Sequence, residues 1–204
     1  MAPKSRYSFL APAIVTGWLL ALLQLAYRGV THRLGANPIA TALNQLGLLA
    51  LVLLVASLAA TPLKHALGWT WPIRVRRTFG LLAFFTASLH FLLYLGADQG
   101  FKLLDVLSDI AKRPFIAVGF FAWLLLVPLA WTSSKRAVQR LTFPVWQRLH
   151  RLVYAVGILA ALHFYLRVKA DHTQPLVYAA IIGFGFAIRA VAWRWKARSK
   201  RARA

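Results

Sequence analysis

The sequence lacks cysteine and glutamate altogether, and its only acidic side chains are four aspartates. Without a thiol, the chain cannot form a disulfide, ligate an iron–sulfur cluster or use a thiolate nucleophile. Any bound metal would have to be held by histidine, methionine or oxygen ligands. Charge of either sign is scarce, since 14% of the residues are charged, against about a quarter in ordinary soluble domains.

What the sequence has instead is apolar residues: 60% of its 204 residues are hydrophobic, and the mean hydropathy is +0.61. A soluble fold of this size could not bury so much apolar surface. The formal net charge of +21 would also suit a nucleic-acid partner. However, the basic residues form short clusters between apolar runs of about 20 residues, the length that crosses a bilayer. Lipid headgroups are the simpler counter-charge, and we expect no nucleic acid as partner.

Six apolar segments can be counted, and they predict an all-α integral membrane protein built as a six-helix transmembrane bundle. The predicted spans are residues 9–27, 43–63, 79–97, 114–131, 152–166 and 175–193. The first is interpreted as an uncleaved span, because no small-residue cleavage signal follows it. The predicted organisation is one membrane domain, residues 1–193, followed by a basic cytoplasmic tail, residues 194–204.

The distribution of basic residues predicts that both termini are cytoplasmic. In that orientation 17 Lys and Arg residues lie in cytoplasmic segments, whereas seven lie on the opposite side together with all four aspartates. The positive-inside rule selects this arrangement. Arg189 is the one basic residue left within a predicted span, and we expect it to snorkel toward the cytoplasmic face.

The segment Gly100–Ile110 carries apolar residues at helical spacing. We expect a short amphipathic helix on the periplasmic surface, serving either as a membrane-surface helix or as a docking surface for a partner.

Two of the six histidines, His90 and His163, lie deep in the third and fifth predicted spans. Both spans start at the cytoplasm, and each histidine follows the nearest basic residue, Arg77 or Arg151, by 12 or 13 residues. The imidazoles are therefore predicted at the same depth, about 18–20 Å along their helices. Facing imidazoles can hold a six-coordinate haem iron. Phe84, Phe85, Phe91, Phe164 and Tyr165 are the candidate apolar walls. The alternative is two unrelated histidines that bond to neighbouring helices.

His150 lies 13 residues before His163, so the two cannot share one haem. The corresponding positions before His90 are Arg76 and Arg77. His150 and these arginines are candidates for a second haem or for contact with a flavin or quinone. Arg151 is a further candidate for contact with a propionate or phosphate. The remaining histidines, His32, His65 and His172, fall in loops and are interpreted as surface residues.

Several short motifs then carry a resemblance. They are Arg76-Arg77-Thr-Phe-Gly80, Leu89-His90, Lys112-Arg113-Pro114, Leu129-Ala-Trp-Thr132-Ser133 and, most specifically, Trp146-Gln-Arg-Leu149-His150-Arg151-Leu152-Val-Tyr154 with Leu162-His163. Over nearly the whole chain the sequence resembles the MsrQ (YedZ) family, haem-binding subunits of the bacterial protein-methionine-sulfoxide reductase system. That family is similar to the ferric-reductase transmembrane domains, which carry paired histidines on their third and fifth helices.

The resemblance implies a ferric-reductase-like bundle in the bacterial inner membrane that carries electrons from the quinone pool, through FMN and haem b, to a periplasmic molybdopterin-dependent methionine-sulfoxide reductase. It implies His90 and His163 as axial ligands, a heterodimer with that reductase, and the quinone pool or a flavin reductase as donor. One haem is expected and two are possible, because one of the four family histidines is an arginine here.

Two other functions stay open at this stage. The first is an autonomous ferric or quinone reductase, and the second is a small membrane transporter without redox activity. No acid is predicted at span depth, which disfavours a proton-coupled transporter. No Gly-x-Gly-x-x-Gly fingerprint of a dinucleotide-binding domain occurs.

Overall fold

The computed structural model describes residues 7–201. The predicted basic residues Lys4, Arg6 and Arg203 lie outside the described residues, and so do positions 202–204 of the predicted tail. Within the described part of the chain every regular element is helical. The α-helices are α1 (Leu10–Val30), α2 (Pro38–Leu67), α3 (Trp71–Leu93), α4 (Leu103–Lys112), α5 (Pro114–Trp131), α6 (Lys135–Leu141), α7 (Phe143–His150), α8 (Leu152–Arg167) and α9 (Thr173–Arg201). A π-helical turn, η1 (Tyr94–Asp98), extends α3.

Six helical segments among the described residues are long and apolar enough to cross a membrane, and each overlaps one of the six predicted spans. The segments are Leu10–Val30, Pro38–Leu67, Trp71–Asp98, Pro114–Trp131, Phe143–Arg167 and Thr173–Trp195. The prediction of an all-α six-span membrane bundle is therefore confirmed. Helix α9 continues to Arg201 without a break at residue 193, so the described part of the tail forms the last turns of this helix, mostly beyond the span that ends at Trp195.

The helix boundaries follow from local sequence. Asn37 caps α2, since its side-chain oxygen accepts from the Ala40 N–H at 3.0 Å and Pro38 occupies the first turn. The same helix ends at Gly68, which has φ of 70° and can adopt this left-handed conformation because it lacks a Cβ. Helix α5 begins at Pro114, a residue whose fixed φ suits a first turn.

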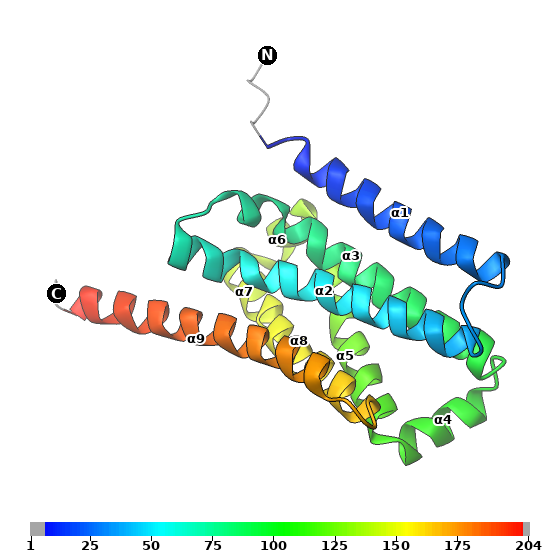
Figure 1. Cartoon of the computed structure of the whole chain (residues 1–204). Coiled ribbons are helices and arrows are strands. Elements are labelled where there is room, and N and C mark those ends of the chain that lie inside the picture. Colours follow the sequence, from blue (N-terminus) through cyan, green and yellow to red (C-terminus); the bar gives the residue numbers. More distant parts are fainter. Residues whose placement is uncertain (1–6, 202–204) are drawn as a thin grey trace.

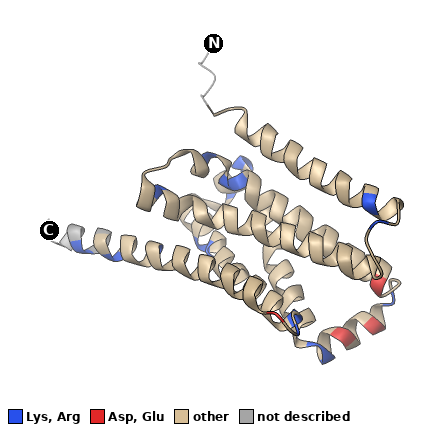
Figure 2. Cartoon of the chain, viewed as in Figure 1, with Lys and Arg blue, Asp and Glu red and all other residues tan. Residues whose placement is uncertain are grey.

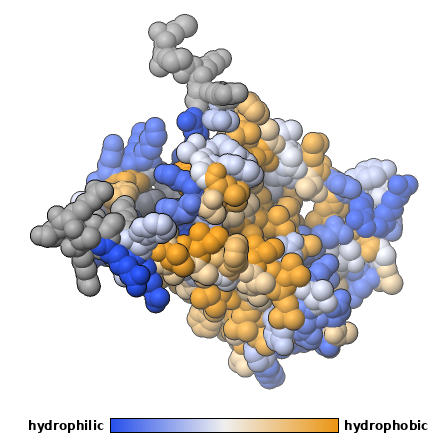
Figure 3. All heavy atoms as spheres, turned by 60° about the vertical axis from the view of Figure 1, so that its left-hand side comes forward, coloured by the Kyte–Doolittle hydropathy of each residue, from blue (hydrophilic) through white to orange (hydrophobic). Residues whose placement is uncertain are grey.

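Helix α2 is the centre of the bundle. It packs most extensively along α3 and also contacts α8 and α9, while α5 packs against α8. The shared core contains Leu53, Leu54 and Leu58 of α2, with Leu82 of α3 and Val156 of α8. Large apolar side chains also cover the outside, where a bilayer would solvate them (Figure 3).

Helix α1 packs loosely on this bundle, and none of its residues is buried. Its main neighbour is α3. Trp18 of α1 donates its indole N–H to Thr86 Oγ1 of α3 at 2.8 Å, and Thr86 is fully buried.

Both described ends of the chain lie at the same end of the bundle, beside the α2–α3 connection and near α6 and α7 (Figure 1). The opposite end is formed by the α1–α2 connection, α4 and the α8–α9 connection. Lys and Arg gather mainly at the first end, whereas Asp residues occur only at the α4 end (Figure 2). We call these the basic end and the α4 end. That the basic end faces the cytoplasm stays a prediction from the positive-inside rule.

The short amphipathic helix predicted over Gly100–Ile110 is confirmed as α4, at Leu103–Lys112. Val106 is buried against the bundle, while Leu103, Leu104 and Leu107 are more than half exposed. This exposed apolar side is consistent with both predicted roles, contact with the membrane surface and contact with a partner.

The side chain of Arg189 does not extend toward the membrane surface as expected. Its guanidinium turns into the bundle, where it donates to the Tyr154 hydroxyl at 2.8 Å and to the buried Leu58 carbonyl. The expectation was wrong because α2 and α8 offer oxygen acceptors at this depth, so the charge does not need to reach the interface.

Candidate functional site

The imidazoles of His90 and His163 face one another inside the bundle, one from α3 and one from α8. Their ring centroids are 6.2 Å apart and their planes are nearly perpendicular, at 84°. The equal depth expected from the sequence is therefore found in the fold. Two imidazoles that each place a nitrogen about 2 Å from a shared metal have centroids about 6 Å apart, so this spacing suits a pair of axial ligands.

Each imidazole is oriented by a backbone carbonyl on a different helix. His90 Nδ1 lies 2.9 Å from the Leu43 carbonyl oxygen of α2, and His163 Nδ1 lies 2.6 Å from the Phe115 carbonyl oxygen of α5. A carbonyl oxygen only accepts, so each Nδ1 carries the proton and donates it. The Nε2 lone pair is then free to bind a metal, and the backbone contact fixes the ring orientation.

Two glycines make room for these rings. A Cβ on Gly119 of α5 would lie 2.6 Å from His163 Nδ1, and a Cβ on Gly47 of α2 would lie 3.3 Å from His90 Cε1. The first distance is below any normal contact, whereas the second would require only a small shift. Glycine at position 119 therefore lets α5 approach closely enough for the Phe115 carbonyl to reach its imidazole.

The two rings line a cavity of about 540 Å³, which is within the usual range for sites that bind small molecules and cofactors. Its walls are largely apolar and include Phe91 of α3 and Phe120 and Trp123 of α5. The ring centroids of Phe91 and Trp123 are 4.7 Å apart, so these aromatics form one packed wall. Small residues, including Ala83 and Ala87, leave space between the helices.

The prediction of which aromatic residues form the walls of the cavity was partly correct. Phe91 and Phe164 line the cavity, but Phe84, Phe85 and Tyr165 do not. Phe85 and Tyr165 are instead 50% and 43% exposed on the outside of the bundle. Sequence proximity to a histidine does not determine which side of a helix faces inward, because consecutive residues project about 100° apart.

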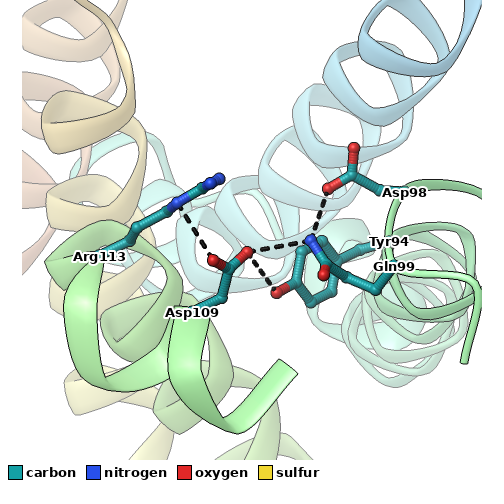
Figure 4. A network of polar contacts seen from close by, with 5 residues as sticks. All are labelled: Tyr94, Asp98, Gln99, Asp109 and Arg113. Carbon is teal, nitrogen blue, oxygen red and sulfur yellow. Dashed lines mark hydrogen bonds and ion pairs between the residues drawn. The ribbon is translucent and has the colours of Figure 1, made fainter. Parts of the chain in front are cut away.

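The cavity becomes polar toward the α4 end, where Asp98, Arg113 and Arg167 are among its lining residues. A hydrogen-bonded network holds this end together (Figure 4). Asp109 of α4 pairs with Arg113 Nε at 3.2 Å and accepts from the Tyr94 hydroxyl at 3.2 Å. Gln99 donates to Asp109 at 3.0 Å and to Asp98 at 3.1 Å.

His150 occupies a different site, at the end of α7 near the basic end. Its Nε2 lies 3.0 Å from Thr132 Oγ1, and its ring stacks on Trp146 with centroids 4.1 Å apart. Arg76 is close enough to His150 and to Arg189 for the charges to interact. Arg76 and His150, both candidates from the sequence, are therefore within electrostatic reach of one another.

The other predicted contacts are placed elsewhere. Arg77 and Arg151 are exposed, and neither lines the cavity that contains His90 and His163. His32 and His65 are exposed, as expected of surface residues, but His65 lies in the last turn of α2 and not in a loop. His172 is half-buried beside Tyr165, with ring centroids 4.7 Å apart.

The residues around the cavity fit a haem. The centroids of the two imidazole rings have the spacing of an axial pair, the walls of the cavity are apolar and aromatic, and Arg113 and Arg167 stand at one end, where carboxylates could bind. Sequence reasoning missed Arg113 and Arg167 as cavity residues, although Arg167 follows His163 by one helical turn and Arg113 precedes Pro114. The signals that could have identified them were the four-residue spacing of Arg167 from His163, which places both on the same side of a helix, and the position of Arg113 at the start of the predicted fourth span.

Comparison with known proteins gives one consistent result. The family model described as "Ferric reductase like transmembrane component" matches residues 45–161. Among curated proteins, the protein-methionine-sulfoxide reductase heme-binding subunit MsrQ of Deinococcus radiodurans is 47% identical, covering 86% of this chain and 87% of its own length. MsrQ of Rhodospirillum rubrum is 47% identical over 93% and 91% of the two chains, and MsrQ of Ralstonia nicotianae is 43% identical over 96% and 90%.

No solved structure matches the chain significantly. The matches to relatives span most of both chains, and the ferric-reductase-like region includes α3, η1, α4, α5, α6 and α7 in full. With six helices long and apolar enough to cross a membrane and a match to a transmembrane family, the chain is a multi-pass membrane protein, and an inner-membrane location agrees with its bacterial relatives. The chain therefore belongs to the MsrQ family and contains a ferric-reductase-like transmembrane component.

Proposed function

We propose that this chain is a membrane electron-transfer subunit that takes electrons from the quinone pool, using FMN and haem b, and delivers them to a periplasmic molybdopterin-dependent protein-methionine-sulfoxide reductase with which it forms a heterodimer. Its relatives in Deinococcus radiodurans and Rhodospirillum rubrum are heme-binding subunits of a protein-methionine-sulfoxide reductase.

The observation that carries this proposal is the pair of imidazoles, 6.2 Å apart, in a cavity with apolar walls. We assign His90 and His163 as the axial ligands. A haem b bound there would supply a one-electron iron couple. The protein's own contribution is to fix the orientation of both imidazoles through the carbonyls of Leu43 and Phe115 and to surround the site with apolar side chains.

The polarity of the bundle supports the proposed direction. The cavity extends toward the α4 end, where all four aspartates lie, whereas most Lys and Arg residues lie at the opposite end. If the basic end is cytoplasmic, the imidazole pair is nearer to the periplasm and to a periplasmic acceptor.

For the basic end we propose one contact site for a flavin or quinone, at His150 and Arg76, and a single haem in the protein. His150 Nε2 already contacts Thr132, the ring stacks on Trp146, and the nearby basic partner is Arg76. An arginine does not serve as an axial ligand of haem iron, which favours one haem over two.

The test is pigment and activity analysis of the full chain purified in detergent from haem-replete cells. We expect a red protein with about one haem per chain, low-spin in both oxidation states, and FMN in the extract. In liposomes with a reduced quinol, electrons should reach methionine sulfoxide only when the periplasmic reductase is present.

Colourless protein from haem-replete cells would contradict the proposal. Rapid turnover with ferric iron or quinone and no partner would favour an autonomous reductase instead. A transporter is disfavoured because all four acids lie at the α4 end and none is near the middle of a span.

A further inference from the structure

The charged side chains that line the cavity are unevenly placed. Apart from the two histidines, Arg113, Arg167 and Asp98 are its charged lining residues, and all three belong to the α4 end. The opposite part of the lining consists of core residues such as Leu54, Ala83 and Val156, which are almost fully buried. The cavity therefore has one cationic end and one apolar end.

The height of Arg167 relative to the imidazoles is set by the helix. It follows His163 by four residues on α8, which places it one turn, about 6 Å, nearer the α4 end. Its charge also reaches the imidazoles of both His90 and His163. A porphyrin held between the two imidazoles would lie across the line that joins them, and Arg167, which lines the same cavity, would then be available to its edge at the α4 end.

Arg113 enters the cavity from the start of α5. Its Nε pairs with Asp109 of α4, and its terminal nitrogens extend beyond that contact (Figure 4). Asp109 is itself held by Tyr94 and Gln99. The pair leaves part of the guanidinium fork available for a further carboxylate, because an arginine offers five N–H donors.

We infer that Arg113 and Arg167 bind the two carboxylates of the haem, so that its propionate edge points toward the α4 end, with Asp109 acting as a positioning residue for Arg113. This inference rests on the proposed function, since it presumes a haem between His90 and His163. It replaces Arg151, which is exposed away from the cavity, as the cationic contact for a propionate.

The probe that tests this inference is haem dimethyl ester, in which both carboxylates are blocked. The full chain, produced under haem limitation and placed in nanodiscs, is loaded with haem or with the ester, and transfer of each to excess apomyoglobin is followed at the Soret band. Loss of each charge-assisted hydrogen bond should speed release about tenfold to a hundredfold. We expect the unchanged chain to release the ester faster than haem by at least that factor.

Single-residue variants show which arginines are responsible for the slower release of haem. Arg113→Gln and Arg167→Gln should each release haem faster while retaining a low-spin spectrum, and the double variant should release haem and ester at similar rates. Lys112→Gln and Lys169→Gln remove exposed neighbouring charges that do not line the cavity and should match the unchanged chain. Asp109→Asn should partly reproduce Arg113→Gln without altering the effect of Arg167→Gln.

Equal release of haem and ester from the unchanged chain would overturn the inference while leaving the axial histidines intact. Failure to bind either pigment would instead contradict the proposed function. Ester binding to the unchanged chain also keeps the test decisive if an arginine variant fails to fold.

Discussion

At the residue scale, Gly119 is the position where the least space separates a helix from the candidate ligand. An alanine there would place its Cβ 2.6 Å from His163 Nδ1, so the ring must leave the Phe115 carbonyl or α5 must move away. We expect Gly119→Ala to cost about 1–3 kcal/mol through overpacking and to give a high-spin or haem-poor protein, measured by absorption spectrum and haem content.

Gly183→Ala is the matched control, because a Cβ at that position of α9 has no neighbour within 4 Å. Alanine is the better helix former by about 1 kcal/mol, so this variant should keep the spectrum and gain slightly in thermal stability. A normal spectrum in Gly119→Ala would mean that the close approach of α5 to His163 is not needed.

The axial pair has its own prediction. His90→Ala and His163→Ala should each abolish the low-spin spectrum and reduce haem content to near zero, because one imidazole cannot form the six-coordinate bis-histidine site. Haem quantification per chain is the measurement, with exposed His65→Ala as the control. If either variant kept full haem content and an unchanged spectrum, the pairing would be incorrect.

The imidazole pair could be predicted from the sequence, whereas the groups that orient it could not. Depth was counted from Arg77 and Arg151, which precede the two predicted parallel spans, and helical rise converts residue number into height. The carbonyls of Leu43 and Phe115 carry no side-chain signal, because every residue has one. Their selection depends on how α2 and α5 pack against the ligand helices.

At the scale of elements, α1 is held to the bundle mainly through α3, and Trp18 supplies a hydrogen bond to the buried Thr86. Trp18→Phe removes the donor, while Thr86 still donates to the Leu82 carbonyl. The loss of about 0.5–1.5 kcal/mol should increase opening of α1 by a factor of about 2 to 12. Hydrogen exchange of α1 in nanodiscs measures this, with Trp193→Phe, an exposed tryptophan of α9, as the control.

Helix α7 carries the second prediction at this scale. His150→Ala should leave the haem between His90 and His163 intact, because His150 does not line that cavity, but it should slow reduction of this haem by quinol. Stopped-flow reduction and haem quantification separate the two effects. A halved haem content would instead indicate a second haem at His150.

Element boundaries were predictable wherever polarity changes sharply, and less so where the chain stays helical. The fifth span was expected to begin at residue 152, yet α7 and α8 follow one another across Arg151 and the apolar segment extends from Phe143. The π-helical turn η1 was also not foreseen, since its apolar spacing resembles that of an ordinary helix end.

At the scale of the whole molecule, orientation is the central prediction. The excess of basic residues at one end should place that end in the cytoplasm. A green fluorescent protein fused to the C-terminus should therefore fluoresce, and alkaline phosphatase fused there should be inactive, with the reverse pattern for fusions in the α8–α9 connection. Active phosphatase at the C-terminus would invert the bundle and the proposed electron path.

Each candidate ligand is tethered to a helix other than its own: α3 to α2 through Leu43, and α8 to α5 through Phe115. The absorption spectrum of a haem coordinated by both histidines would then report whether these helices remain packed together. A harsh detergent that lets α5 slip away from α8 should turn the pigment from low-spin to high-spin while the circular dichroism of the helices is still unchanged.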